Sequence, residues 1–349
     1  MVSTRWWASV ASCAWVAFMS FTAAETPLPV TNPEPPPLPS GKLVRYEGNP
    51  LVRNGPEPYD FYRVSPRAVL KMGPGDYRMW YEAVAGDWLT TVGYATSRDG
   101  LKWVKRGVVL SPSEPWEMEE ICVNSVIFDG GIYKLWYHGG GYVRGKRRLG
   151  HGRVGYATSK DGVTWTKYQG NPVLDIGPAN TFDSNQTADP RVFHLPDGYR
   201  MYYTGQEEEG RQLSLGMATS PDGVHWTKYA GNPILDARAW GFWSGALFPE
   251  NGIWHLWYGS INPDGGGRSN LRYKWSTDGI TWKDGPSNPV LLQNPDPKAP
   301  DYGLSGDSVC VYRDGDTYRI LYTGHNSNLF GKLGRFMGIC MASIKAAKQ

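Results

Sequence analysis

The segment GYATSRDGLKW at residues 93–103 recurs along the chain and decides its fold. Three related copies follow it, namely GYATSKDGVTW (155–165), LGMATSPDGVHW (215–226) and YKWSTDGITW (273–282). The Asp of the Asp-Gly pair stands at 99, 161, 222 and 278, so the copies are 62, 61 and 56 residues apart. Near-constant spacing of this length is typical of a protein built from repeated supersecondary units.

A second, aromatic motif precedes each copy and occurs five times. It reads YRMWYEA (77–83), YKLWYHG (133–139), YRMYYTG (199–205), WHLWYGS (254–260) and YRILYTG (318–324). A strand-like apolar run comes before each motif, and each Asp-Gly turn leads into a further strand. Every unit therefore reads as four antiparallel strands, here called A to D, which is the pattern of a propeller blade. We predict an all-β, five-bladed β-propeller with four antiparallel strands per blade.

The fifth unit, residues 303–345, has strands A to C but no strand D. The segment LVRYEGNPLV at 43–52 closely matches KYQGNPVL at 167–174, which follows the second Asp-Gly turn. We therefore predict that 43–52 pairs as the outermost strand of the last blade, against residues 336–341. This pairing removes an open sheet edge. A β-sandwich, the alternative, explains neither five units nor the displaced strand.

The repeated turn residues and the cysteines are expected to be structural. In each S-x-D-G-x-x-W turn, Asp caps the turn, Gly adopts a positive φ and Trp packs between blades. Cys310 and Cys340 lie on strands A and C of one blade, too far apart for a disulfide. We expect them, like Cys122, to be free thiols.

Bulk properties narrow the functional class. The chain has 349 residues and a net charge of +3, too small to indicate nucleic-acid binding. Residues 1–24 read as a signal peptide whose apolar run is too short for a membrane span. A proline-rich leader (25–41) and the propeller domain (42–345) would follow. We expect a secreted or periplasmic monomer.

The loops divide between two faces of a propeller. The A–B and C–D turns are short, whereas the D–A and B–C connections on the opposite face are long and polar. Long loops on one rigid face are where a site is expected. His138 and His325 begin two of the B–C loops. Aromatic residues of the D–A loops are candidates to stack on a ligand: Trp116, Trp240, Trp243 and Tyr302.

Strand A lines the central channel, and its polar residues are the main site candidates. Aligning the five A strands places Ser65, Asn124, Asp189, Ser244 and Asp307 at equivalent positions at the channel mouth. The alignment rests mainly on SPRAV (65–69) against DPRVF (189–193). Arg67 and Arg191 would then point to the same side as these residues. Polar filling of a wet channel is the alternative interpretation.

The repeat and the blade count resemble the five-bladed propellers of glycoside hydrolase families 32, 43, 62, 68 and 117 and of the family 130 phosphorylases. The resemblance covers residues 43–345. Families 32 and 43 use an Asp near the start of blade one, an Asp followed by Pro in a later blade, and a Glu as proton donor. Only Asp189-Pro190 matches cleanly, and Asp60 is a substitute for the first-blade Asp because Ser65 stands at the channel position. The nearest Glu candidates are Glu82, Glu119, Glu120 and Glu207.

The resemblance implies a glycosidase that acts on an oligo- or polysaccharide. The sequence has no metal-ligand spacing and no phosphate-binding Gly loop, so we expect no metal and no other cofactor. The predicted catalytic residues are Asp189, Asp60, Glu120, Asp307 and Glu207, and the predicted substrate-binding residues are Arg67, Asn124, Arg191, Trp243, His138 and His325. Two alternatives stay open. The basic cluster 144–153 could hold phosphate for a phosphorylase, and the absence of a Glu from the channel positions is compatible with a non-catalytic carbohydrate-binding propeller.

Overall fold

The structure is a computed structural model that describes residues 39, 41–140, 151–207, 213–236, 242–261, 269–326 and 336–346. For residues 242–244, 261, 269, 307 and 336 it describes the backbone alone. These ranges fall within one compact unit, Pro36–Gln349. The predicted signal peptide and most of the proline-rich leader lie outside the described residues.

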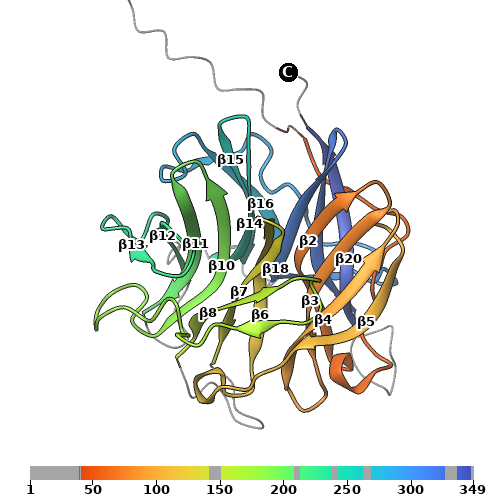
Figure 1. The fold of residues 1–349 in the computed structure, drawn as a ribbon. Coiled ribbons are helices and arrows are strands. Elements are labelled where there is room, and N and C mark those ends of the chain that lie inside the picture. The colour runs from red at the N-terminus through yellow and green to blue at the C-terminus, as the bar shows by residue number, and fades with distance from the viewer. Residues whose placement is uncertain are drawn as a thin grey trace, which may run out of the picture. The chain divides into compact units, whose positions relative to one another are not determined.

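Five four-stranded antiparallel sheets make up the fold, and in each sheet the strands are hydrogen-bonded in the order A, B, C, D (Figure 1). The predicted five-bladed propeller is therefore confirmed. Blades one and two consist of β2 (Arg63–Gly73), β3 (Asp76–Val84), β4 (Thr90–Ser97) and β5 (Trp103–Leu110), then β6 (Ile121–Asp129), β7 (Ile132–Gly139), β8 (Arg153–Ser159) and β9 (Thr166–Lys167). Blades three and four consist of β10 (Gln186–Leu195), β11 (Gly198–Gln206), β12 (Ser214–Ser220) and β13 (Thr227–Lys228), then β14 (Phe242–Glu250), β15 (Ile253–Ile261), β16 (Ser269–Ser276) and β17 (Lys283–Asp284). Two 3₁₀ turns, η1 (Pro58–Asp60) and η2 (Pro115–Glu117), lie in the D–A loops of blades one and two.

The last blade combines the two ends of the propeller, as predicted. Its strands are β18 (Gly303–Asp314), β19 (Thr317–Asn326), β20 (Phe336–Lys345) and the N-terminal β1 (Val44–Arg45). Val44 pairs with Ser343, and further along Val52 forms a bridge with Ile339. The side-chain amide of Asn49 exchanges two hydrogen bonds with the backbone of Met341, so it continues the ladder where the strand breaks.

The Asp-Gly turns have the predicted structural role. In the first turn, Asp99 Oδ1 accepts the backbone N–H groups of Leu101 and Lys102, and Gly100 has φ +69°. The other three turns repeat these contacts. The turns also join the blades, because the Trp80 indole of blade one donates to the Gly162 carbonyl in the turn of blade two. The Trp165 ring of that turn packs 6.2 Å from the Trp80 ring.

The core consists of the strand-B aromatics packed between neighbouring blades. Trp80, Trp136 and Trp257 are at most 1% exposed. The three cysteines that the structure describes, Cys122, Cys310 and Cys340, are buried and free, which confirms that Cys310 and Cys340 are not bonded to each other.

Candidate functional site at the channel mouth

A β-bulge interrupts strand A in every blade at the same depth in the channel. The register shifts between Pro66 and Ala68, Val123 and Ser125, Ala188 and Arg191, Phe242 and Gly245, and Ser305 and Val309. Bulges turn a side chain out of the regular alternation. Each of the five A strands therefore turns one bulged residue toward the central channel, outside the regular in-and-out alternation of side chains.

The bulges correct one part of the strand-A alignment. Asn124, Asp189, Ser244 and Asp307 all lie in the bulges of their strands, but Ser65 pairs regularly with Glu82. In blade one the bulged residue is Arg67. The alignment of SPRAV with DPRVF predicts the bulge of β2 one residue before its observed position. Arg67 and Arg191 are therefore not equivalent. Arg67 is in the bulge, whereas Arg191 resumes regular pairing opposite Tyr202.

Asp189 is the centre of a cluster that three blades supply. Its backbone has φ +50°, which is uncommon for a residue other than Gly. The carboxylate accepts hydrogen bonds from Asn124 Nδ2 at 2.7 Å, from the Arg67 guanidinium at 3.3 Å and from Thr204 Oγ1 at 3.4 Å. Its side chain is still 12% exposed. The chain thus holds an acceptor-only carboxylate in a fixed orientation and leaves part of it accessible.

His138 links Asp189 to a second carboxylate. Its Nδ1 lies 3.3 Å from Asn124 Oδ1 and 3.7 Å from Asp189 Oδ1. Its Nε2 lies 3.7 Å from Glu120 Oε1, and the Glu120 side chain is 14% exposed. One imidazole therefore faces both carboxylates, which puts them within roughly 10 Å of each other, close to the separations that inverting glycosidases use.

Glu82 is a third carboxylate, but two arginines hold it in the ionised form. Its oxygens accept hydrogen bonds from Arg63 and Arg67, and the Cys122 thiol donates to Oε2 at 3.2 Å. Burial on its own raises the pKa of Glu82, but the two guanidinium groups outweigh it and hold the pKa well below the ordinary value. Glu82 is thus unsuited to donate a proton. Through Arg67 it connects to Asp189 and fixes the position of that arginine.

Arg191 lies beneath the cluster and bonds to the four other blades. Its guanidinium donates to the backbone carbonyls of Arg67, Asn124, Gly245 and Val309. Burial lowers the pKa of Arg191 below its ordinary value. Below this level the channel continues as a cavity of about 200 Å³ lined mainly by apolar strand-A side chains. Arg191 therefore acts as a cross-brace between the blades at the base of the site. Its guanidinium N–H groups donate to backbone carbonyls of the other four blades.

Asp60 belongs to a feature that recurs in four blades and that we call the carboxylate latch. In each, a buried carboxylate of the D–A loop pairs with a cation of strand D at 2.6 Å. The pairs are Asp60–Lys105, Glu117–Lys167, Asp183–Lys228 and Asp301–Arg45. In three of the latches a strand-B tyrosine also donates to the carboxylate: Tyr137, Tyr203 and Tyr322. Among the contacts of the described residues, Asp60 is joined to its own latch and not to Asp189.

The remaining predicted site residues are dispersed or outside the described side chains. Glu207 lines a separate cavity in blade three. His325 pairs with Gly303 in the last blade, and its imidazole ring packs against that glycine. The backbones of Trp243 and Asp307 are placed in β14 and β18, but their side chains lie outside what the structure describes, as do Trp240 and the basic residues 144–148.

Two members of the cluster, Arg63 and Thr204, were not predicted. A signal for Thr204 exists in the strand-B repeat, where the residue after the final Tyr is Glu82, His138, Thr204, Gly259 or Thr323. Three of these five residues contact the Asp189–Arg67 network. A position that varies in chemistry within an otherwise regular repeat, next to the channel, marks the site.

No group of three or more His, Cys, Asp or Glu side chains in the part of the chain that the structure describes could hold a metal ion. No described helix has the length and apolar character to cross a membrane.

Comparison with protein families supports the predicted resemblance. Residues 70–235 match the model of the glycosyl hydrolases family 32 N-terminal domain. The chain is 29% identical over 211 residues to an uncharacterised protein of Mycobacterium tuberculosis, covering 56% of this chain and 65% of that protein. It is 27% identical over 179 residues to the fructan 6-exohydrolase of Beta vulgaris, covering 48% of this chain and 29% of that enzyme. The matches thus span less than two thirds of either relative.

Solved structures share the fold over almost the whole propeller. A family 117 glycoside hydrolase of Zobellia galactanivorans superposes with a TM-score of 0.60 at 19% identity, covering 88% of this chain and 90% of that protein. The family 32 β-fructofuranosidase of Bombyx mori gives a TM-score of 0.58 at 16% identity, with 85% and 62% covered. The predicted resemblance to five-bladed propeller glycoside hydrolases is confirmed.

Proposed function

We propose that this propeller is a secreted glycoside hydrolase that cleaves an oligo- or polysaccharide at the channel mouth, with Asp189 and Glu120 as its two carboxyl groups. One observation carries the proposal: residues of three blades converge on Asp189, and the His138 imidazole lies 3.7 Å from a carboxylate oxygen of Asp189 and 3.7 Å from one of Glu120. Most glycoside hydrolases use two carboxyl groups on either side of the scissile bond.

The surroundings of the two carboxyl groups suggest different roles. Asp189 accepts hydrogen bonds from a guanidinium, an amide and a hydroxyl, which fix the orientation of its carboxylate. This carboxylate would stabilise the positive charge that develops on the sugar ring, or activate the attacking water. Glu120 faces the imidazole of His138 instead of a permanent cation. We therefore assign Glu120 as the acid that protonates the leaving oxygen, with His138 orienting it.

The residues below the cluster would keep this geometry rigid. Arg67 contacts both Glu82 and Asp189, so any shift of Asp189 breaks an ion-paired hydrogen bond. Arg191 fixes the bulge carbonyls of Arg67 and Asn124. Reacting groups held to within a fraction of an ångström contribute several kcal/mol to catalysis through orientation alone.

Secretion is part of the proposal and rests on the pattern of residues 1–24. The substrate class rests on the propeller resemblance and on the relatives named fructan 6-exohydrolase and levanase.

The test is a screen of the purified propeller against fructans, aryl glycosides and plant or algal oligosaccharides, with and without phosphate. We expect reducing sugar to appear without phosphate. Release of a sugar phosphate that requires added phosphate would favour the phosphorylase, and glycan binding without turnover would favour the binding module.

A further inference from the structure

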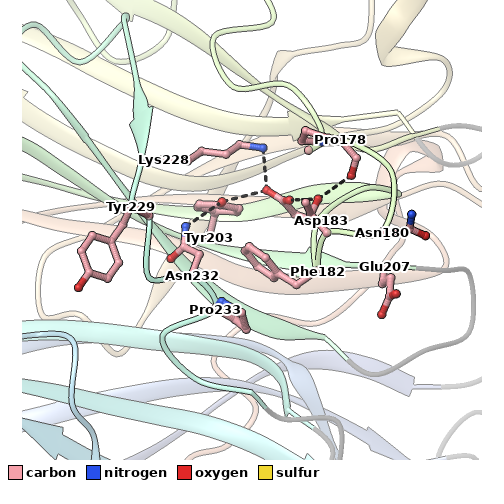
Figure 2. A pocket seen from close by; sticks show the side chains of 13 residues that line it. Pro178, Asn180, Phe182, Asp183, Tyr203, Glu207, Lys228, Tyr229, Asn232 and Pro233 are labelled. Atoms are coloured by element: carbon pink, nitrogen blue, oxygen red, sulfur yellow. Dashed lines mark hydrogen bonds and ion pairs between the residues drawn. The ribbon is translucent and has the colours of Figure 1, made fainter.

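Blade three contains a cavity of about 480 Å³ beside its carboxylate latch. Residues 177–183 of the D–A loop form one wall, and Lys228 to Pro233, at and after strand D, form the other. Figure 2 shows Asp183 among the lining residues, joined to Lys228 and Tyr203, with the Phe182 ring near it and Tyr229 at one end of the group. The volume lies in the range of ligand-binding cavities in proteins.

The cavity exists where blade three carries smaller residues than blade two. Trp116 and Glu117 of blade two correspond to Phe182 and Asp183 of blade three, because each pair supplies an aromatic ring followed by the latch carboxylate. Trp116 lies nearly parallel to the latch tyrosine Tyr137, 5.9 Å away. Phe182 likewise lies 5.8 Å from its latch tyrosine Tyr203, and its ring is close over Gly205 and Gly216, where a Cβ atom on either glycine would collide with it. The smaller ring and the shorter carboxylate leave space above the sheet.

The chemistry of the lining favours a neutral, hydroxyl-rich ligand. The Asp183 charge is balanced by Lys228 at 2.6 Å, so the latch offers no uncompensated charge to an ionic ligand. Phe182 and Tyr229 supply aromatic surface, and the amide of Asn180 and the carboxylate of Glu207 supply hydrogen-bonding groups at the rim. Aromatic surface with a few polar groups suits a sugar ring, which has apolar C–H faces and polar edges.

The cavity is adjacent to the Asp189 cluster along one strand. Tyr203 contacts the latch in the cavity, and the next residue of β11, Thr204, contacts Asp189. Their Cα atoms are ~3.8 Å apart and their side chains point to opposite faces of the sheet. Glu207, three residues beyond Thr204, lies on the same functional face. Because Glu207 also lines the cavity, the cavity reaches the loops of the functional face, and a substrate chain that leaves the channel mouth over blade three could enter it there.

We infer that this cavity is a second carbohydrate-binding site, which holds a sugar unit of the substrate chain away from the bond that is cleaved. The inference rests on the proposed function for the nature of the ligand. It implies that the natural substrate is longer than the units held at the channel mouth.

The chain offers a matched pair of variants for the test. Tyr229 (TKYAGNP) and Tyr168 (TKYQGNP) are equivalent tyrosines of blades three and two, each is 39% exposed, and each ring packs over a glycine two residues later. Tyr229→Ala removes a wall of the cavity, and Tyr168→Ala makes the same truncation outside it. Tyr229→Phe keeps the ring.

Binding of a chain-length series of the active oligosaccharide is measured by calorimetry in the Asp189→Asn background, so that turnover does not interfere. We expect Tyr229→Ala to weaken binding of the longer chains by about 10-fold, whereas Tyr168→Ala and Tyr229→Phe bind like the parent. Equal affinities for Tyr229→Ala and Tyr168→Ala at every chain length would overturn the second site and leave the proposed function intact. No binding of any glycan to the parent would overturn both.

Discussion

Replacing Arg191 by Met tests whether one guanidinium holds the five blades together. Met has a similar length and fills the same buried space, but it cannot donate hydrogen bonds. The substitution leaves four backbone carbonyls, on Arg67, Asn124, Gly245 and Val309, without the donor that they have now. Each carbonyl belongs to a different blade, so the substitution removes the hydrogen bonds that link blade three to each of the other four blades through this side chain.

The expected magnitude follows from two opposing effects. A buried acceptor without its donor costs ~1–3 kcal/mol, so four of them give an upper limit near 12 kcal/mol. Removing a buried charge returns several kcal/mol of desolvation free energy. The net loss should be about 3–5 kcal/mol, the range measured when one partner of a buried charged network is removed. For a domain of about 300 residues that loss lowers the Tm by roughly 5–8 °C.

The assay is thermal unfolding followed by tryptophan fluorescence, since core tryptophans lie between the blades. Arg98→Met, at an exposed position in the first Asp-Gly turn, is the control and should unfold with the wild type. Arg191→Lys keeps the charge with fewer and differently directed donors and should fall between the two. A Tm within about 3 °C of wild type for Arg191→Met would refute the cross-brace.

Three further predictions concern stability. Deleting residues 25–40 should leave the Tm unchanged, whereas deleting 25–52 removes β1 and its Arg45–Asp301 latch and should cause aggregation; equal Tm values would contradict the closure. Glu82→Gln should cost about 3 kcal/mol at pH 7. The folded-state pKa of Glu82 is below its ordinary value of 4.5, so the wild type loses this extra stability progressively as the pH falls below 4.5. The free energies of unfolding of the two proteins, measured in urea, should therefore converge at low pH. A difference that stays constant with pH would argue against the ionised Glu82. Burial lowers the pKa of His255 to about 4, so wild type should lose stability as the pH falls from 6.5 towards 4, and His255→Gln should show a flatter profile over that range in the same unfolding assay.

The repeats made the fold predictable because each blade has to solve the same packing problem. Three motifs occupy equivalent positions in successive blades: the Asp-Gly turns, the strand-B aromatics and the Asn-Pro segments. A strand predicted in one repeat can therefore be verified against the same motif in the next repeat. The displaced strand at 43–52 was recognisable for the same reason: Arg45 and Asn49 carry the cation and the amide that other blades carry after strand C.

The site was less predictable because it depends on where the repeat is broken. A bulge shifts register by one residue without any mark in the sequence, so Ser65 was placed where Arg67 lies. Asp60 was a reasonable substitute for a first-blade carboxylate, since only the fold shows that Asp60, Glu117, Asp183 and Asp301 form one structural series. Contacts such as Glu82–Arg67–Asp189 join blades that are more than 100 residues apart.

The most direct test of the central claim compares turnover by wild type and Asp189→Asn on the best substrate of the screen. Asn keeps the size of the side chain and removes its charge. The account predicts a fall in kcat of at least ~100-fold with the Tm within a few degrees of wild type. Glu120→Gln should show a comparable fall, and Glu119→Gln, at the neighbouring position, should not. Turnover by Asp189→Asn within about threefold of wild type would contradict catalysis at the channel mouth.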